Sequence, residues 1–232
     1  MPSFHGTLTK MAAHLDNDLT QYQVVIGEQN VDLNPYLNKT VRFEYTGNIF
    51  CSACGKKTKK SYAQGHCFVC MRKLASCDMC IMKPETCHYD QGTCREPSWG
   101  EANCMVDHYV YLSNTSSVKV GITRHTQIPT RWIDQGATQG LPIFKVKTRQ
   151  LSGLIEVELA KLISDKTNWR TLLKQDGEPL PLVDVFHQLY PQIEDHIAQL
   201  KAQFGDDSIE ILVTPNDDDS KITPIRYPVT EY

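Results

Sequence analysis

The nine cysteines of this 232-residue sequence all lie between Cys51 and Cys104. Four of them form two Cys-x2-Cys pairs: Cys51, Cys54, Cys67 and Cys70. Thiolates in two such pairs suit the tetrahedral coordination of Zn²⁺, and Gly55 and Gly65 ease the turns beside them. Because four protein ligands leave no position for water, we predict a structural zinc ribbon over residues 51–70, with no catalytic zinc there.

A second group of cysteines follows the ribbon: Cys77, Cys80, Cys87, Cys94 and Cys104. Cys77 and Cys80 form a third Cys-x2-Cys pair, and sequence order favours Cys87 and Cys94 as the remaining ligands of a second Zn²⁺. His88, Cys104 or His108 could replace either of these two. Four thiolates also suit an iron–sulfur cluster, which is the alternative cofactor. Two four-cysteine sites use eight thiols, so at least one of the nine is expected to stay free.

The net charge of −3 is unevenly distributed. Residues 51–174 carry +8, whereas residues 1–50 carry −2 and residues 175–232 carry −9. The ribbon loop GKKTKKSYAQGH holds four lysines and no acid, so it could contact phosphates. A basic centre of this kind favours a polyanionic partner.

The sequence also indicates where the protein works. No apolar run approaches the roughly 20 residues that a membrane-spanning helix needs, and MPSFHGTLTK lacks the apolar core of a signal peptide. We therefore expect a cytoplasmic protein without a membrane partner. In that compartment, clustered cysteines indicate metal sites more than disulfides.

Hydrophobic periodicity predicts the elements that must position these residues. Alternation at Tyr22–Ile26 and Val41–Tyr45 predicts two early strands. HYVYL and VKVGIT predict a hairpin. Pro129 and Gly136 mark the two ends of a short helix. Residues 141–148 are expected to form a third strand, and residues 151–163 an amphipathic helix. Near the C-terminus we expect a helix from Val183 to Phe204, bent or divided at Pro191, and then two short strands.

This pattern predicts an α+β fold with four segments. Residues 1–50 form a β-rich N-terminal segment, and residues 51–104 a cysteine-rich zinc-binding module. Residues 105–174 form a β-β-α-β-α domain, and residues 175–232 an acidic C-terminal helix with strands.

The two hairpin strands have different sides. The apolar side comprises Val110, Leu112, Val118, Val120 and Ile122. The polar side comprises Tyr109, Tyr111, Lys119, Gly121 and Thr123. Gly121 leaves room for a ligand or backbone to approach, and Arg131 on the following helix could reach this side.

The third strand adds positive charge, because Lys145, Lys147 and Arg149 alternate with other residues and make one side of it cationic. Together with the basic centre, this predicts DNA or RNA as the partner. Trp132 and Trp169 could stack on bases.

The hairpin and its neighbours resemble the GIY-YIG endonuclease superfamily. Tyr109-Val110-Tyr111 stands for the first signature triplet and Lys119-Val120-Gly121 for the second, although the superfamily has glycine at the first position and tyrosine where Lys119 stands. Arg131 matches the essential arginine. Glu156 and Glu158 compete for the metal-binding glutamate, and Glu156 is preferred because Glu158 is expected to point into the apolar stripe.

The resemblance implies phosphodiester hydrolysis with one Mg²⁺ or Mn²⁺ ion. Glu156 would hold the ion, Tyr111 would deprotonate or orient the attacking water, and Arg131 would stabilise charge on phosphorus. Expected substrate contacts are Tyr109, Lys119, Gly121, Arg124, Lys145, Lys147 and Arg149. Tyr111 and Arg131 could instead have purely structural roles: the tyrosine would pack against the sheet, and the arginine would form an ion pair with Asp134. A non-catalytic scaffold that binds nucleic acid or protein, and an iron–sulfur or redox protein, are the other function classes.

Over most of its length the chain is also similar to an uncharacterised bacterial family with an N-terminal cysteine-rich zinc module. The resemblance rests on CDMCIMKPETCHYDQGTCREPSWG, KVGITR and IPTRWIDQGAT. Members of that family continue beyond RYPVTEY into further strands, which implies a shortened form here.

Overall fold

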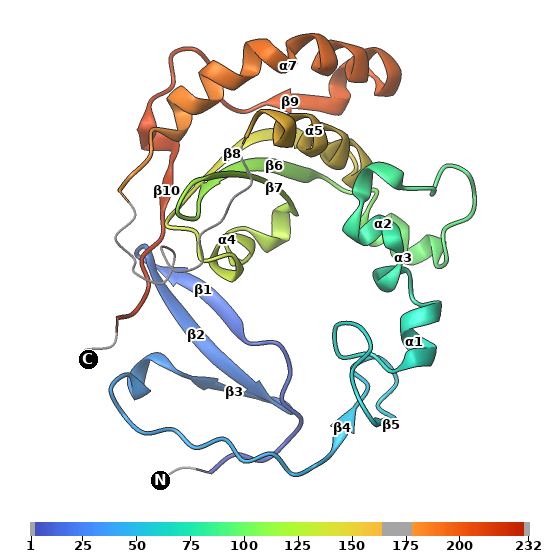
Figure 1. The fold of residues 1–232 in the computed structure, drawn as a ribbon, viewed down its shortest axis with the longest axis vertical. Helices are drawn as coiled ribbons and strands as arrows, with labels where there is room; N and C mark the ends of the chain where they lie inside the picture. The colour runs from blue at the N-terminus through green and yellow to red at the C-terminus, as the bar shows by residue number, and fades with distance from the viewer. Residues whose placement is uncertain (1–2, 164–177, 230–232) are drawn as a thin grey trace.

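A five-stranded sheet forms the centre of the protein (Figure 1), whose computed structural model describes residues 3–163 and 178–229. Strand β6 (His108–Asn114) pairs antiparallel with β7 (Val118–Arg124) on one side and with β8 (Gln139–Val146) on the other. Strands β9 (Ile209–Ile211) and β10 (Thr223–Pro224) both pair with β8. The sheet therefore joins segments from the middle and the end of the chain.

One face of this sheet carries the main hydrophobic core. Val110, Leu112 and Ile122 are buried there, as the alternation of the hairpin predicts, and Val118 and Val120 pack against them. Helices α5 (Arg149–Leu162) and α7 (Leu182–Phe204) cover this face (Figure 1). The predicted apolar side of the hairpin is confirmed.

Helix α4 (Thr130–Asp134) packs on the opposite face, close to the predicted bounds between Pro129 and Gly136. Its residues Trp132 and Ile133 form a second core cluster with Tyr111. Because Trp132 is only 1% exposed, the expectation that it stacks on bases is wrong. Trp169, the other stacking candidate, lies outside the described residues.

The predicted cationic side of the third strand is also wrong. Strand β8 ends at Val146, and α5 begins at Arg149. The reason is Thr148, whose hydroxyl accepts a hydrogen bond from the Leu151 N–H at 3.2 Å and so caps the helix. Lys147 and Arg149 thus lie beyond the strand and do not share one face of it with Lys145.

The C-terminal segment completes this domain. Helix α7 runs through Pro191 without division, because its buried residues, among them Leu189, Ile193 and Ile197, hold it on the core on both sides of the proline. The predicted boundary at residue 174 falls outside the described residues, and β9 and β10 extend the sheet of β6–β8 beyond it. The short 3-10 turns η5 (Asp206–Ser208) and η6 (Asp219–Lys221) precede these two strands.

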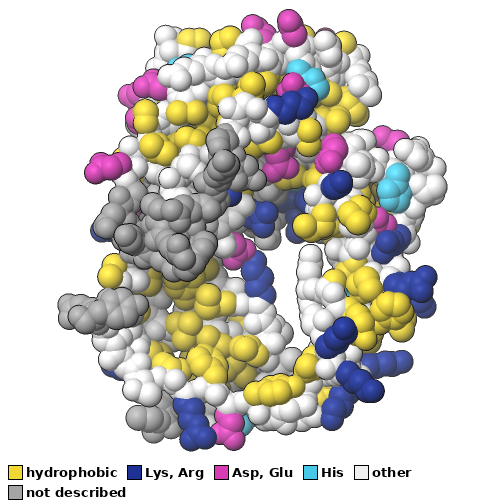
Figure 2. Space-filling view, in the orientation of Figure 1, with side chains coloured by type: hydrophobic (Ala, Val, Ile, Leu, Met, Phe, Trp, Pro, Cys, Tyr) yellow, Lys and Arg dark blue, Asp and Glu magenta, His cyan; other side chains and the backbone are white. Residues whose placement is uncertain are grey.

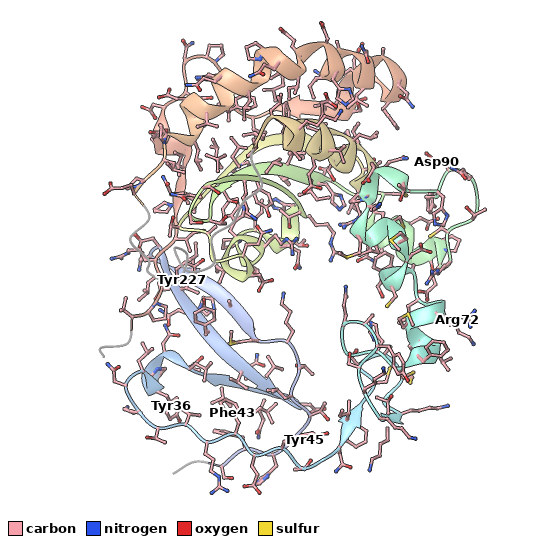
Figure 3. All side chains as sticks on the ribbon, viewed as in Figure 1. Tyr36, Phe43, Tyr45, Arg72, Asp90 and Tyr227 are labelled. Carbon is pink, nitrogen blue, oxygen red and sulfur yellow. The ribbon has the colours of Figure 1, made fainter. Side chains whose placement is uncertain are left out.

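The N-terminal segment forms a separate antiparallel sheet of β1 (Ala12–Asp16), β2 (Leu19–Ile26) and β3 (Gln29–Asp32), followed by the 3-10 turn η1 (Asn34–Tyr36). The strand predicted at Tyr22–Ile26 is confirmed. This sheet lies against the C-terminal segment, where the Thr20 N–H donates to the Arg226 carbonyl at 2.8 Å. Tyr227, labelled in Figure 3, donates to the Ala137 carbonyl at 2.8 Å.

The second early strand, predicted at Val41–Tyr45, does not form. Val41, Phe43 and Tyr45 are 45%, 64% and 70% exposed, and residues 40–46 belong to no strand (Figure 3). Alternation there predicted a half-buried strand, but a strand also needs a partner, and no strand in the described parts of the chain pairs with this segment.

The cysteine-rich module runs down one side of the molecule (Figure 1). It begins with the small hairpin of β4 (Ile49–Phe50) and β5 (Lys57–Thr58) and continues through short helices. These are α1 (Phe68–Lys73), η2 (Ala75–Cys77), α2 (Met79–Met82), η3 (Pro84–Thr86) and α3 (Pro97–Asn103); a further turn, η4 (His125–Gln127), follows β7. Within the described ranges, no helix has the length and apolar character needed to cross a membrane.

The module packs closely on α5. A Cβ at Gly153 would lie 2.6 Å from the Pro84 Cβ and 2.7 Å from the Glu85 backbone nitrogen. We therefore expect Gly153→Ala to lower the free energy of unfolding by about 1–3 kcal/mol, although alanine is the better helix former. Val157→Ala, at a 42% exposed position of the same helix, should change it by less than about 0.5 kcal/mol. Denaturant unfolding measures both, and a Gly153→Ala protein as stable as the parent would contradict this packing.

Candidate functional site

The first cysteine cluster can hold a metal ion. The sulfur atoms of Cys51, Cys54, Cys67 and Cys70 all lie within 4.8 Å of one another, and the Sγ atoms of Cys54 and Cys67 are 4.0 Å apart. Four thiolates bound tetrahedrally at about 2.3 Å from Zn²⁺ would be about 3.8 Å apart. The cluster therefore needs only small adjustments to bind such an ion.

Local backbone geometry brings these sulfurs together. Gly55 and Gly65 adopt positive φ angles of 69° and 85°, which glycine tolerates best, and each lies beside one Cys-x2-Cys pair. The Gly55 N–H donates to the Cys51 carbonyl at 2.9 Å, and this bond closes the first turn. The Cys67 N–H donates to the Cys51 sulfur at 3.2 Å and links the two pairs.

The electrostatics of the cluster are uneven. Backbone N–H groups, that of Cys67 foremost, lower the pKa of Cys51 to about 5. Burial, together with the other thiols, raises the pKa of Cys70 to about 12. One sulfur is thus ready to bind as a thiolate, whereas the other needs a nearby cation to lose its proton.

The second cysteine group surrounds a small cavity of about 20 Å³. Its lining includes four of the cysteines together with His88: Cys80, Cys87, Cys94 and Cys104. Cys77, which sequence order placed in the second site, does not line this cavity, and neither does His108. Burial and the neighbouring Asp78 raise the pKa of Cys80 to about 11.

His108 lies buried in β6, where its Nδ1 is 2.7 Å from the Val106 carbonyl oxygen. Burial lowers its pKa to about 4, so the imidazole is neutral. Because this neutral imidazole is buried in the sheet and does not line the cavity, His108 is not a ligand of the second site.

The tyrosine, arginine and glutamate of the predicted catalytic set come together. Tyr111 is fully buried, and its hydroxyl donates to the Gln135 Oε1 at 2.7 Å. Burial raises its pKa to about 12, an effect that Arg131 opposes from close by. Asp134 pairs with Lys10 at 2.5 Å, so the alternative pairing of Arg131 with Asp134 is not observed.

The space beside Gly121 is occupied by the Tyr111 side chain and is not open to a ligand. The two residues are directly opposite each other in the hairpin, and a Cβ at position 121 would lie 2.6 Å from the Tyr111 Cζ and hydroxyl oxygen. The room that the sequence places at Gly121 is therefore filled by the tyrosine ring.

Glu156 and Glu158 differ in their surroundings. Burial raises the pKa of Glu156 to about 7, against the opposing effects of Arg149 and Arg131. Glu158 does not point into the apolar stripe, which corrects that expectation: it lies near the surface and forms an ion pair with Lys161, which lowers its pKa. Glu156 is thus the carboxylate of this cluster, which we call the catalytic candidate cluster (Tyr111, Arg131, Gln135 and Glu156).

Most cations expected to contact a substrate already have partners within the protein. Lys145 pairs with Asp107 at 3.1 Å and Lys147 with Asp207 at 3.8 Å. Arg149 donates to the Ile81 carbonyl at 2.8 Å, and Arg124 donates to the Asn103 side chain. Tyr109 packs its ring 5.5 Å from that of His125, and Lys119 lies half-buried in β7.

The ribbon carries an aromatic pair that the sequence patterns did not predict. The rings of Tyr62 and Phe68 lie 5.4 Å apart, with Lys60 Nζ 4.8 Å from the Tyr62 ring centroid and the Arg72 guanidinium 5.7 Å from that of Phe68. Both rings are exposed, at 44% and 47%. The lysine-rich loop before Tyr62 is the signal that could have found this pair. Gln135 was not predicted either, because no pattern in the sequence provides a signal for it.

Comparison with known proteins identifies the family of this chain. Residues 38–232 match the family described as "Protein of unknown function (DUF2797)". The chain belongs to the DUF2797 family. No curated protein and no solved structure matches it. The matched region of this DUF2797 protein contains every cysteine and the whole catalytic candidate cluster, and it leaves out the sheet of β1–β3.

The raised pKa of Glu156 predicts a pH dependence. The ordinary pKa of this carboxyl is 4.5, and in the folded protein it is about 7, so folding strengthens proton binding. The stability that the bound proton contributes is therefore fully present below pH 4.5 and is lost as the pH rises through about 7. Glu156→Gln should therefore gain stability relative to the parent, on the order of 1–3 kcal/mol, between about pH 5 and about pH 8.

Thermal unfolding without divalent cations measures this difference. Glu158→Gln is the control, because the lowered pKa of Glu158 gives the opposite sign. A stability difference between parent and Glu156→Gln that does not change with pH would show that Glu156 has an ordinary pKa.

Proposed function

We propose that this protein is a zinc protein that binds nucleic acid through its ribbon. The observation that carries the proposal is a basic surface that is interleaved with aromatic rings and has no acidic partner among the described residues. We call it the basic aromatic surface, and it comprises Lys56, Lys57, Lys59, Lys60, Tyr62, Phe68, Arg72 and Lys73.

The charge of this surface supports a phosphate partner. Residues 51–73 contain six lysines and arginines and no aspartate or glutamate. Figure 2 shows dark blue side chains gathered over the region that Figure 1 assigns to β5 and α1, and Figure 3 labels Arg72 there. Among the described residues none of these cations forms an ion pair, in contrast to Lys145 and Lys147. Each is therefore available to replace a counterion on a phosphate backbone.

The aromatic pair supports a single-stranded partner. Tyr62 and Phe68 are held beside each other by the turn of the ribbon, and both present exposed rings. Stacking of a base on such a ring contributes about 1–3 kcal/mol and tolerates any sequence. Bases are exposed for stacking in single strands but not in a duplex.

Zinc would act as a structural element. The short helix α1 buries none of its residues, so apolar packing alone does not hold the ribbon. Binding of Zn²⁺ by Cys51, Cys54, Cys67 and Cys70 would supply the missing folding free energy and fix the aromatic pair in place.

Binding of labelled single-stranded DNA and RNA oligonucleotides tests the proposal. Tyr62→Ala and Phe68→Ala should each weaken binding by about 5-fold to 100-fold, since each removes one stacking platform. Phe43→Ala is the control, because Phe43 is an exposed aromatic residue outside the surface, at 64% exposure. Equal affinities for all three variants and the parent, or no binding at low salt, would refute the proposal.

A second candidate function is metal-dependent phosphodiester cleavage at the catalytic candidate cluster. The observation in its favour is the buried carboxyl of Glu156 within the electrostatic reach of Arg131 and Tyr111, at the positions that the GIY-YIG resemblance assigns to chemistry. Glu156 would hold Mg²⁺ or Mn²⁺, which when bound supplies charge stabilisation for the leaving oxygen.

The side chains of the cluster suggest a division of roles. Arg131 is exposed at the edge of the cluster and would contact the phosphate. Tyr111, with its pKa raised to about 12 and its hydroxyl bonded to Gln135, is a poor base, and it would orient water or phosphate by hydrogen bonding.

Cleavage assays with Mg²⁺ and with Mn²⁺ on single-stranded and duplex DNA and RNA test this candidate. We expect Arg131→Ala and Glu156→Ala to lower the cleavage rate at least about 100-fold while zinc content is unchanged. Glu158→Ala, on the same helix but paired with Lys161, should retain the rate. Cleavage that survives in Glu156→Ala, or no cleavage of any substrate, removes this candidate and leaves the binding proposal standing.

A further inference from the structure

We infer that Cys80, Cys87, Cys94 and Cys104 bind a second metal ion, one Zn²⁺, and that Cys77 is the free thiol. The inference concerns the cavity enclosed by the cysteine-rich module and does not depend on nucleic-acid binding or cleavage.

Four short elements each supply one thiol to the cavity. Cys80 lies in α2, Cys87 directly follows η3, Cys94 lies in the loop before α3, and Cys104 caps the end of α3. These elements have little packing of their own, since α2 buries none of its residues and α3 buries only Gly100. A shared metal ion would hold together elements that apolar contacts do not.

Gly100 shows how closely α3 approaches this group. A Cβ at position 100 would lie 3.3 Å from the Cys94 sulfur and 3.0 Å from the Tyr89 ring. The helix thus comes down directly on the cysteine loop, as a shared site between Cys94 and Cys104 requires.

Asp78 and His88 are the competing ligands, because their side-chain ligand atoms lie within 4.8 Å of each other and of the Cys80 sulfur. The four proposed cysteine sulfurs form no group this close among the described residues, so the metal ion would have to draw them together. Asp78 is already bonded elsewhere, whereas the side chain of His88 is hydrogen-bonded, within the described part of the chain, only through its Nδ1, and its Nε2 lies 3.7 Å from the nearer Asp78 oxygen. Asp78 accepts from Arg95 Nε at 2.6 Å and from the Met79 N–H at 2.6 Å, and His88 Nδ1 lies 2.7 Å from the Thr93 hydroxyl. They fit better as a polar layer around a four-thiolate site than as its ligands.

The size and chemistry of the cavity favour one zinc ion. About 20 Å³ accommodates roughly one water-sized atom, which is too little for a cluster of several irons and sulfides. Four thiols line this cavity, and four thiolates drawn to one ion suit Zn²⁺.

The site would also anchor the helix that carries Glu156. The Arg149 N–H donates to the Cys104 carbonyl at 2.8 Å, and the Gln150 side chain donates to the Cys87 carbonyl at 3.2 Å. Two of the four ligand residues therefore bond directly to the first turn of α5.

Elemental analysis of the purified full chain and two matched variants tests the inference. We expect two zinc ions per chain in the parent and in Cys77→Ser, and one in Cys104→Ser. Loss of an ion from Cys77→Ser, retention of both by Cys104→Ser, or iron in place of the second zinc would overturn it. Loss of one ion in Cys51→Ser reports separately on the first cluster.

Alkylation of the unchanged protein provides a test that needs no variant to fold. Cys77, Cys80, Cys87 and Cys94 all have intermediate exposure, so burial alone does not set Cys77 apart. With metal bound, a maleimide should modify Cys77 first, and a chelator should make the other three reactive. Protection of Cys77 together with modification of Cys80, Cys87 or Cys94 before chelation would contradict the assignment.

Discussion

The cysteine-rich module has almost no apolar core, and this constraint governs how the rest of the molecule is held. Across residues 51–104 the buried positions are Cys51, Ala75, Pro84, Gly100 and Cys104, two of which are thiols. Small buried residues of this kind contribute little hydrophobic free energy. Sulfur ligation at the first cluster, and by our inference at the second, is the interaction able to replace it.

The central sheet has a different source of stability and offers a different kind of site. Its main core, with α5 and α7 on one face, is built mainly of apolar side chains, whereas Tyr111, Trp132 and Gly121 fill the other face. Glu156 lies within the electrostatic reach of Arg131 on α4 and of Glu85 in the cysteine-rich module. A carboxyl in that position depends on α5, and α5 bonds at its first turn to Cys104 and Cys87.

Local patterns in the sequence predicted those parts of the structure that depend on local physics. Cysteine spacing identified the first cluster, and period-2 alternation assigned Val110 and Leu112 to the core. The same alternation failed at Val41–Tyr45, where no strand within residues 3–163 and 178–229 supplies hydrogen bonds, and at Lys147–Arg149, where Thr148 starts a helix. Partner strands and caps depend on tertiary structure, which periodicity does not report.

In the candidate sites, too, the sequence predicted what local spacing determines and failed where tertiary structure brings distant residues together. Sequence order grouped Cys77 with Cys80 in one metal site. In the structure Cys104, which is more distant along the chain, lines the cavity beside Cys80, and Cys77 does not, because α3 folds back over this cavity. The aromatic pair of Tyr62 and Phe68 was missed for a similar reason, since only the turn of the ribbon brings the two rings together. Helical spacing placed Glu158 in the apolar stripe, but it is Glu156 whose carboxyl is largely buried, so the reason given for preferring Glu156 was wrong.

The most direct test of this account is hydrogen exchange of the full chain with and without a metal chelator. We predict that residues 51–104 and the first turn of α5 lose protection when metal is removed, while β6, β7 and β8 keep theirs. Protection of residues 51–104 that persists in the metal-free protein would contradict the claim that metal ligation holds this module together.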